Sequence, residues 1–297
     1  MAAACLVAGA ALSTRAAANR RVRLDRLRTE QRRRTGRSAA PGDLRLSVVV
    51  PAYGEAVRIA DTIAALRAAL APVDGEGGVE LIVVDDGSTD GTSEAARAGG
   101  ADQVVSLPVN RGKGAAVRSG VLVARGRTVA FTDADLSYAP EQLMRLLTEV
   151  ESGWDVVVGS RKHIETNVLV RGRRMRELSG RVFNILTLGV LLGQYRDTQC
   201  GLKAFRSDVA RQLFSNARID GFAFDVEIFH LIERYRLSLL EIPVALANSD
   251  TSTVRVGVEV VRMLRDLFRV RRWASQGVYD DDRTGADVLS PLRSSVT

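Results

Sequence analysis

The sequence predicts an α/β fold, in which a mostly parallel β-sheet is flanked by helices. Short apolar runs alternate with amphipathic helical patterns from residue 46 onward, and this alternation is typical of parallel strands joined by helical crossovers. The chain has 297 residues, of which 46% are hydrophobic and 26% are charged. This length and this composition suit a folded body with a sizeable core.

Five apolar runs are predicted to be strands buried on both faces, because each run is continuous rather than alternating. They are LSVVV (46–50), ELIVVD (80–85), QVVSL (103–107), TVAFT (128–132) and DVVVG (155–159). Helical patterns lie between them, near residues 55–71, 90–99, 112–124 and 140–152. Pro140 suits the first turn of the last of these helices. A Rossmann-like sheet of this kind binds ligands beyond the carboxyl ends of its strands.

The positive charge of the chain is concentrated at its start. The formal net charge is +7, but residues 1–45 hold eleven arginines against three acidic residues, a net of +8, so residues 46–297 carry −1. The sequence pI near 10.0 suggests nucleic-acid binding as an alternative from another class. That alternative is disfavoured, because aromatic residues make up 5% of the chain and no nucleic-acid motif is found, so no nucleic-acid partner is expected.

The first residues are predicted to lie near a membrane. Residues 1–12, MAAACLVAGAAL, are apolar, whereas a spanning helix needs roughly 20 apolar residues. The segment is interpreted as the end of a signal-anchor or as a segment at the interface, followed by an arginine-rich, membrane-proximal arm that extends to residue 45. Arginines in this position would hold the body at the cytoplasmic face. Cys5 and Cys200 are too few for a disulfide framework, which fits a reducing compartment.

Basic and apolar segments also follow the predicted strands. Residues 161–181 contain seven basic residues and adjoin VFNILTLGVLLG (182–193). Residues 251–276 are predicted to be a basic amphipathic helix lying in a membrane surface, with an ordinary amphipathic surface helix as the alternative. Residues 277–297 are predicted to be disordered. One face of the helix carries Arg262, Arg265, Arg269 and Arg272, and the other carries Val261, Leu264, Leu267 and Phe268.

Five short motifs fall at or just after the predicted strand ends. They are VVVPAYGEA (48–56), VVDDGSTDGT (83–92), NRGKGAA (110–116), DADLS (133–137) and VGSRK (158–162). Singly each has an ordinary interpretation: Asp-Gly-Ser is a common turn, and GKGAA lacks the P-loop spacing. In the first motif Pro51 is predicted to end the strand and Glu55 to start a helix. Together, at one edge of the same sheet, the five motifs indicate a binding site.

Asp133 and Asp135 directly follow the strand TVAFT. Carboxylates at the end of a buried strand cost free energy unless positive charge meets them. A pair spaced in this way can hold Mg²⁺ or Mn²⁺ and leave coordination positions for phosphate oxygens. A diphosphate held there is a good leaving group, because the charge that develops on it is neutralised in place.

The neighbouring motifs supply further groups for such a ligand. Lys113 and Arg161 can add cationic contacts to a diphosphate, and Asp85 or Asp86 could accept a hydrogen bond from the imide of a uracil ring. The combination predicts a nucleotide-sugar site.

The five motifs resemble the successive motifs of the family 2 inverting glycosyltransferases with a GT-A fold, and the resemblance covers roughly residues 46–250. YRDTQCGLKAF (195–205) followed by FAFDVEI (222–228) is similar to the dolichyl- or polyprenyl-phosphate β-glucosyltransferase branch. The sequence departs from the family at Gly54, where Asn is common, and at Ser137, where some mannosyl relatives place another metal-binding side chain.

The resemblance implies a role for each matching residue. Pro51, Tyr53, Glu55 and Asp85 would frame the nucleotide, and Asp133 and Asp135 would hold the metal, with Asp135 the more direct ligand. Arg161 and Arg176 would meet phosphate, and Ser179 and Asn184 also match. Asp197 and Gln199 would approach the sugar or the metal. Asp225 and Glu227 are secondary candidates that could instead fix a loop or pair with an arginine.

A lipid phosphate is favoured as the acceptor, because arginine-rich stretches beside apolar segments suit an anionic head group at a membrane face. With UDP-glucose as the expected donor, the product would be a β-linked polyprenyl-phosphate glucose, which a separate membrane protein would flip. A phosphate is ionised at neutral pH and needs no strong base, and His163 and His230 are the only histidines in the sequence, the latter expected to pack on its helix. The alternatives are a mannosyltransferase using GDP-mannose, a transferase acting on a polysaccharide or soluble hydroxyl acceptor, and a non-catalytic nucleotide-sugar sensor.

Overall fold

The computed structural model describes residues 38–161, 197–246 and 256–280. Apart from Ser38 and Ala39, these residues belong to the second of the two units into which the chain divides, Met1–Ala39 and Ala40–Thr297. The predictions for the arginine-rich arm up to residue 37, for residues 162–196 and for the tail from residue 281 lie outside the described residues. Arg176, Ser179 and Asn184 are among them.

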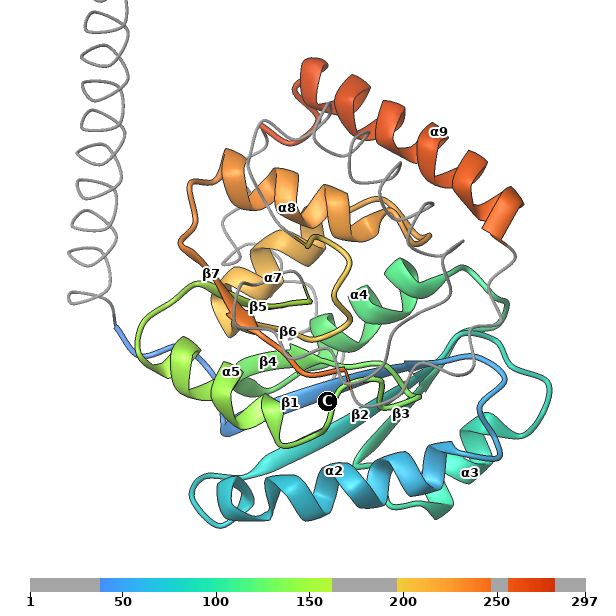
Figure 1. The fold of residues 1–297 in the computed structure, drawn as a ribbon, viewed down its shortest axis with the longest axis vertical. Helices are drawn as coiled ribbons and strands as arrows, with labels where there is room; N and C mark the ends of the chain where they lie inside the picture. Colours follow the sequence, from blue (N-terminus) through green and yellow to red (C-terminus); the bar gives the residue numbers. More distant parts are fainter. Residues whose placement is uncertain (1–37, 162–196, 247–255, 281–297) are drawn as a thin grey trace, which may run out of the picture. The chain divides into compact units, whose positions relative to one another are not determined.

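A mixed sheet of seven strands, counted over the described ranges, forms the centre of the second unit (Figure 1). The strands are β1 (Leu44–Ala52), β2 (Val79–Asp85), β3 (Gln103–Ser106), β4 (Gly126–Phe131), β5 (Val156–Ser160), β6 (Lys203–Arg206) and β7 (Leu239–Pro243). Their order is β3-β2-β1-β4-β6-β5-β7, and β6 runs antiparallel to β4 and β5 while the other neighbours pair in parallel. The predicted mostly parallel sheet is confirmed, and all five predicted strands are present.

Two strands differ in detail from the prediction. β3 is exposed or half-buried along its length, because it forms an edge of the sheet, so the expectation that it is buried on both faces is wrong. β1 does not end at Pro51 but continues to Ala52, with Pro51 opposite Val84 of β2. The pairing of β1 with β4 has already ended at Val49, so no donor is needed from the Pro51 nitrogen on that side.

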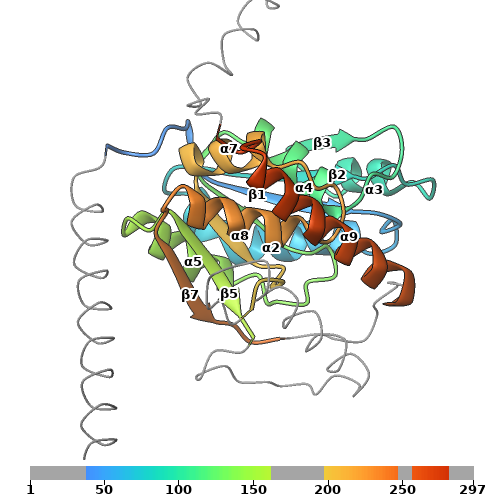
Figure 2. The ribbon, with the colours of Figure 1, turned by 90° about the horizontal axis from the view of Figure 1, so that it is seen from above.

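Helices cover both faces of the sheet (Figures 1 and 2). They are α2 (Ile59–Asp74), α3 (Thr92–Ala98), α4 (Lys113–Val123), α5 (Gln142–Glu151), α7 (Ser207–Asn216), α8 (Phe224–Arg234) and α9 (Val256–Ser275). The first four match the four predicted helical patterns. α2 begins later than predicted, after a turn that Glu55 opens, and it includes Pro72 in its last turn.

The two faces of the sheet belong to two separate apolar cores. α4, α7, α8 and α9 share one core with side chains such as Val49, whereas α2 and α5 share the other with side chains such as Val48 and Val50. Neighbouring residues of β1 therefore point into different cores, as the period of a strand requires. The central strands are buried on both sides, and polar groups are left to gather at the strand ends.

α9 packs against the domain through its apolar face. Leu267 and Val270 are buried in the same core as α8, and Met263, Leu264 and Trp273 are partly buried against it. The expectation that Leu264 and Leu267 face a membrane is therefore wrong. Phe268, by contrast, is 72% exposed. Among the described residues, no helix combines the length and the apolar composition that crossing a bilayer requires.

The packing of α9 can be tested by truncating one buried and one exposed residue. Leu267→Ala is expected to lower the free energy of unfolding by about 2–5 kcal/mol, because it leaves a cavity between α9 and the core. Phe268→Ala is the matched control and is expected to change it by less than about 0.5 kcal/mol. Urea unfolding of the full chain measures both, and equal losses would contradict the observed orientation of the helix.

Candidate active site

The predicted site residues gather at one edge of the sheet because β1, β2, β4 and β5 all end there. Asp133 and Asp135 follow β4, and Arg161 follows β5. β6 is antiparallel and begins at this same edge, with Lys203 opposite Phe131 of β4. The segment from Asp197 to Lys203 is thereby inserted between the ends of β4 and β5.

Asp133 is paired with a lysine of the protein. Its carboxylate accepts a hydrogen bond from the Nζ of Lys113, at the start of α4, and forms an ion pair with it. Burial disfavours the charged amine, but the nearby charges of Asp133, Asp225 and Asp135 outweigh it and raise the pKa of Lys113. Lys113 is therefore a firmly protonated cation beside the first of the two predicted metal ligands.

Asp135 lies near the acidic side chain of Glu55. Its Oδ1 accepts a hydrogen bond of 2.9 Å from the backbone N–H of Ser137. Burial raises the pKa of Glu55, and the charges of Asp135 and Asp90 raise it further, although the ion pair with Arg58 at 2.8 Å opposes them. Glu55 and Asp135 are thus close enough to repel each other, and a cation placed between them would relieve this repulsion.

These side chains fit a hard divalent cation. The potential ligands are carboxylate oxygens, which Mg²⁺ and Mn²⁺ prefer, and both aspartates directly follow the end of β4. Within the part of the chain that the structure describes, no group of three or more His, Cys, Asp or Glu side chains is arranged to hold a metal. Asp133 and Asp135 would therefore bind such an ion together with oxygens of a substrate or of water, as the sequence predicts.

Gly201 makes room for the Asp133 carboxylate, and the sequence analysis did not identify it. A Cβ atom at Gly201 would lie 2.0 Å from Asp133 Oδ2, much closer than two nonbonded atoms can approach. Any side chain at residue 201 would push Asp133 out of its position. The signal in the sequence is the glycine inside YRDTQCGLKAF, a segment that carries the resemblance to the glucosyltransferase branch but indicates no role for Gly201.

A buried lysine–aspartate pair lies beneath these groups. Lys203, which is 1% exposed, donates to the carboxylate of Asp225 and, at 3.0 Å, to the backbone carbonyl of Thr198. Burial and the charge of Asp133 raise the pKa of Asp225, whereas Lys203 and Lys113 lower it. Lys203 also lies 5.5–5.9 Å from the ring centres of Phe131, Phe224 and Phe229. Asp225, a secondary candidate, thus pairs with a lysine rather than with an arginine.

Arg161 and Asp197 bind each other. The Arg161 Nε and Nη2 donate to the two oxygens of the buried Asp197 at 2.7 and 2.8 Å, and the Arg161 backbone N–H adds a bond of 3.0 Å. The backbone N–H of Gln199 also approaches Asp197, at 3.3 Å. The structure therefore brings the three residues together, with Asp197 orienting the guanidinium at the site edge.

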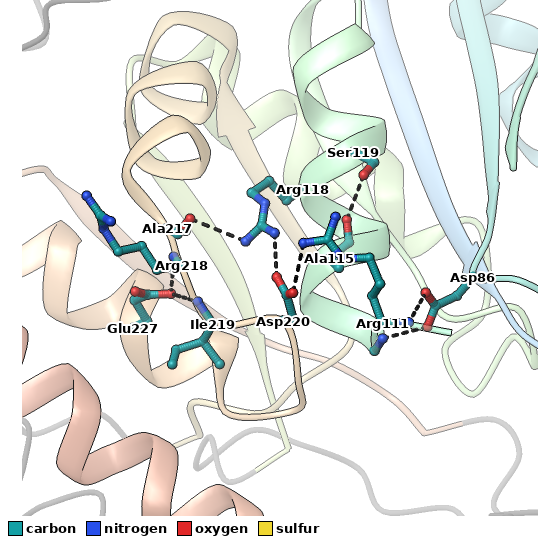
Figure 3. Close-up of polar contacts among 11 residues, drawn as sticks. Asp86, Arg111, Ala115, Arg118, Ser119, Ala217, Arg218, Ile219, Asp220 and Glu227 are labelled. Carbon is teal, nitrogen blue, oxygen red and sulfur yellow. Dashed lines mark hydrogen bonds and ion pairs between the residues drawn. The ribbon is translucent and has the colours of Figure 1, made fainter. Parts of the chain in front are cut away.

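Asp85 and Asp86 hold loops at the carboxyl end of β2. Asp85 accepts hydrogen bonds from the Ser88 backbone N–H at 2.9 Å and from the Ser93 hydroxyl. Asp86 accepts from the backbone N–H groups of Arg111 and Gly112 at 2.8 and 2.7 Å (Figure 3). Asp86 thus fixes the loop that leads into Lys113.

Tyr53 is 58% exposed, and its neighbour Gly54 has a left-handed φ of 70° with open space around it. Glycine adopts this backbone conformation freely and Asn tolerates it better than most residues, so the backbone here could accept either residue. Pro51 is half-buried beside them in the last part of β1. Tyr53 is therefore accessible for contact with a ligand at this edge.

Glu227 and His230 of α8 both make contacts that stabilise the fold. Glu227 accepts hydrogen bonds from the Arg218 and Ile219 backbone N–H groups at 2.9 and 2.7 Å (Figure 3) and from the Tyr279 hydroxyl at 2.6 Å. It therefore fixes the loop before α8, one of the two alternatives considered for it. The His230 ring centre lies 5.7 Å from that of Tyr279, which confirms that His230 packs on its helix.

Comparison with known proteins agrees with this architecture. The sequence model of the family described as Glycosyl transferase family 2 matches residues 47–214. The chain is similar to the dolichyl-phosphate beta-glucosyltransferase of Drosophila melanogaster, with 35% identity over 76% of the chain and 74% of the relative. It is also similar to the enzymes of the same name from Saccharomyces cerevisiae, with 31% identity over 80% and 77%, and from Homo sapiens, with 32% identity over 76% and 74%.

Solved structures show the same fold. Glucosyl-3-phosphoglycerate synthase from Mycobacterium tuberculosis, crystallised with Mn²⁺, UDP and glucosyl-3-phosphoglycerate, has a TM-score of 0.58 and 23% identity, over 82% of this chain and 83% of the other. This likeness supports the GT-A arrangement of strands and helices.

The position of Asp133 above Gly201 leads to a prediction. Gly201→Ala is expected to displace the Asp133 carboxylate and to weaken Mn²⁺ binding roughly tenfold to a hundredfold, as loss of support for a metal ligand commonly does. Gly75→Ala is the control, because Gly75 has an ordinary helical conformation and its nearest neighbour atom is 3.9 Å from the added Cβ. Calorimetric titration with Mn²⁺ and UDP measures the effect. Unchanged affinity in Gly201→Ala would show that Asp133 does not need this space.

The buried Lys203–Asp225 pair leads to a second prediction. Lys203→Met is expected to cost about 3–5 kcal/mol of unfolding free energy, because Asp225 is left buried without its partner. The double variant Lys203→Met/Asp225→Leu is expected to recover much of this loss.

The exposed pair of Glu94 and Arg97 serves as the control, since removing such a pair costs less than about 1 kcal/mol. Urea unfolding of the single and double variants gives the coupling energy. Additive effects of the two substitutions would argue against the buried ion pair.

Proposed function

The chain belongs to glycosyl transferase family 2, and on this premise we propose that it transfers glucose from UDP-glucose to a polyprenyl, dolichyl-type phosphate with inversion at the sugar C1. The observation that carries the proposal is the Asp133–Asp135 pair directly beyond the carboxyl end of β4, at the edge of the sheet where β1, β2 and β5 also end. The choice of sugar and acceptor is supported by relatives named dolichyl-phosphate beta-glucosyltransferases at 31–35% identity.

The nucleotide is proposed to lie over the carboxyl ends of β1 and β2. Tyr53 is exposed there and could contact the base, with Pro51 and Glu55 beside it. Asp85 and Asp86 bind loop N–H groups, so their first role is to shape this region, and either carboxylate has acceptor capacity left for an imide N–H of uracil.

The diphosphate is proposed to lie between Asp133, Asp135 and Lys113. Mg²⁺ or Mn²⁺ bound by the two aspartates would neutralise the charge that develops on the departing diphosphate. Lys113 is held protonated at the same place and can donate to a phosphate oxygen. The pair of Asp225 and Lys203 lies beneath these groups. The charge of Asp225 also helps to keep Lys113 protonated.

The acceptor is proposed to approach from the side of Arg161. An acceptor phosphate carries most of its second negative charge at neutral pH, so it can attack without a general base. One of its oxygens forms a bond to C1 while the bond from C1 to the diphosphate oxygen breaks, and UDP leaves with the electron pair. Attack opposite to an α-linked leaving group gives a β-linked product. Arg161, oriented by Asp197, would hold the incoming phosphate.

A membrane position follows from an acceptor of this kind. Residues 46–250 are proposed as the catalytic domain, and residues 1–45 and 251–276 as segments that bring it to the cytoplasmic face of the membrane. Transport of the lipid-linked product across the bilayer would then need a separate membrane protein.

A radiolabel transfer assay tests the proposal. The full chain is incubated with polyprenyl phosphate and labelled UDP-glucose or GDP-mannose, with Mn²⁺ or with a chelator, and the product is extracted into organic solvent. Label is expected to enter the lipid phase from UDP-glucose, and to disappear with chelator. Free polyprenol is expected to be no acceptor, because its hydroxyl would need a base.

The same assay tests the metal ligands with matched carboxylate variants. Asp135→Asn is expected to lower transfer by roughly a hundredfold or more, because charge stabilisation by a metal contributes several kcal/mol. Asp61→Asn, on the exposed side of α2, is the control and is expected to retain activity. Full activity of Asp135→Asn, or faster transfer from GDP-mannose, would contradict the proposal.

A further inference from the structure

An arginine-lined cavity of about 490 Å³ lies beside the loop that leads into Lys113, and none of the residues that line it is assigned to the sugar nucleotide. Three segments form it: residues 110–112 before α4, residues 218–222 before α8, and the α9 residues between Arg262 and Arg269. Its charged lining consists of five arginines and two aspartates, a net charge of +3. The arginines are Arg111, Arg218, Arg262, Arg265 and Arg269.

The fold holds the Arg111 side chain and the loop of Arg218 in place. One carboxylate oxygen of Asp220 accepts a hydrogen bond of 2.9 Å from the Arg111 Nη2, and the other accepts one from Arg118 of α4 (Figure 3). The loop that carries Arg218 is fixed through its backbone N–H, which donates to Glu227 at 2.9 Å. Asp220 is therefore paired with arginines, and Asp266 lies near two others. The lining keeps an excess of positive charge.

α9 contributes cations that face solvent. Arg265 and Arg269 have side chains that are 62% and 49% exposed, at 3.7 and 3.3 Å from the carboxylate of Asp266. The shared partner compensates one charge at most. The rim of the cavity on this helix is thus cationic and accessible.

In two of the three segments that line the cavity, a lining residue is followed or preceded in the sequence by an exposed apolar residue. Val109, next to the first lining residue of the 110–112 loop, is 62% exposed, and Phe268, next to Arg269, is 72% exposed. Cationic groups combined with exposed apolar ones are typical of surfaces that contact lipid bilayers. A site for a small soluble anion would have no use for these apolar neighbours.

We propose that this cavity binds the phosphate of an anionic phospholipid head group at the bilayer surface, while Phe268 and Val109 enter the adjoining interface. A phospholipid head group is favoured because the lining is positively charged and because exposed apolar residues flank the cavity. The choice of a bilayer rests on the proposed function, whose acceptor is a membrane lipid. α9 therefore has two roles: Leu267 and Val270 pack against the domain, and its opposite side binds lipid.

The test is binding of the full chain to vesicles of phosphatidylcholine, with or without phosphatidylglycerol, measured by flotation. Wild-type protein is expected to bind the anionic vesicles. Arg265→Gln/Arg269→Gln is expected to bind them about thirtyfold more weakly, from the usual contribution of two arginines at an anionic surface. Phe268→Ser is expected to weaken binding as well.

The matched control removes the same charge from the same helix outside the cavity. Arg271→Gln/Arg272→Gln alters two exposed arginines of α9 that do not line it, and it is expected to weaken binding by less than about threefold. Equal loss in the two double variants would show a diffuse surface attraction and overturn the proposal. No loss in Arg265→Gln/Arg269→Gln would overturn it too.

Two further measurements separate this inference from its alternatives. If inorganic phosphate bound the protein and displaced the vesicles at equal affinity, the cavity would be a site for a soluble anion, and the proposal would be wrong. UDP binding, measured by calorimetry without lipid, is expected to be the same in Arg265→Gln/Arg269→Gln as in wild type. Reduced UDP binding would assign the cavity to the nucleotide site instead. Vesicle binding with the expected pattern but without glucose transfer would refute the proposed function and leave this inference standing.

Discussion

The contact between Lys113 and Asp133 is the interaction on which the rest of the site depends. It joins the beginning of α4 to the end of β4 and brings a cation to carboxylates that would otherwise be costly to place at a buried strand end. Asp86 holds the loop before Lys113, and Gly201 leaves space for Asp133. Because Asp225 and Lys203 lie directly below, the charges form a connected arrangement rather than a set of isolated pairs.

The sheet explains how distant parts of the chain reach this place. Parallel strands bring the ends of β1, β2, β4 and β5 to one edge, as the general rule for such sheets requires. The antiparallel β6 adds what parallel strands alone could not, since its beginning carries residues 197–203 to the same edge. Among the residues that the structure describes, few carboxylates gather at this place, so a metal bound there would need further ligands from a diphosphate or from water.

Much of the fold and part of the site could be predicted from the sequence. The strands with continuous apolar runs and the first four helices were found, because buried parallel strands have a clear pattern. β6, KAFR, was missed because it is short and includes a lysine that is charged yet buried. The roles of Lys203, Gly201 and Asp86 depend on contacts across the sheet or between loops, which no local pattern contains. The orientation of α9 was misjudged because an apolar helical face looks the same whether it packs against protein or against lipid.

Diffraction at the manganese absorption edge, from crystals grown with UDP and Mn²⁺, is the most direct test of the site. The account predicts an anomalous peak within coordination distance of carboxylate oxygens of Asp135 and Asp133, with the UDP diphosphate on its open side and Lys113 beside it. A peak at another place, or UDP bound with no manganese near the end of β4, would contradict the account.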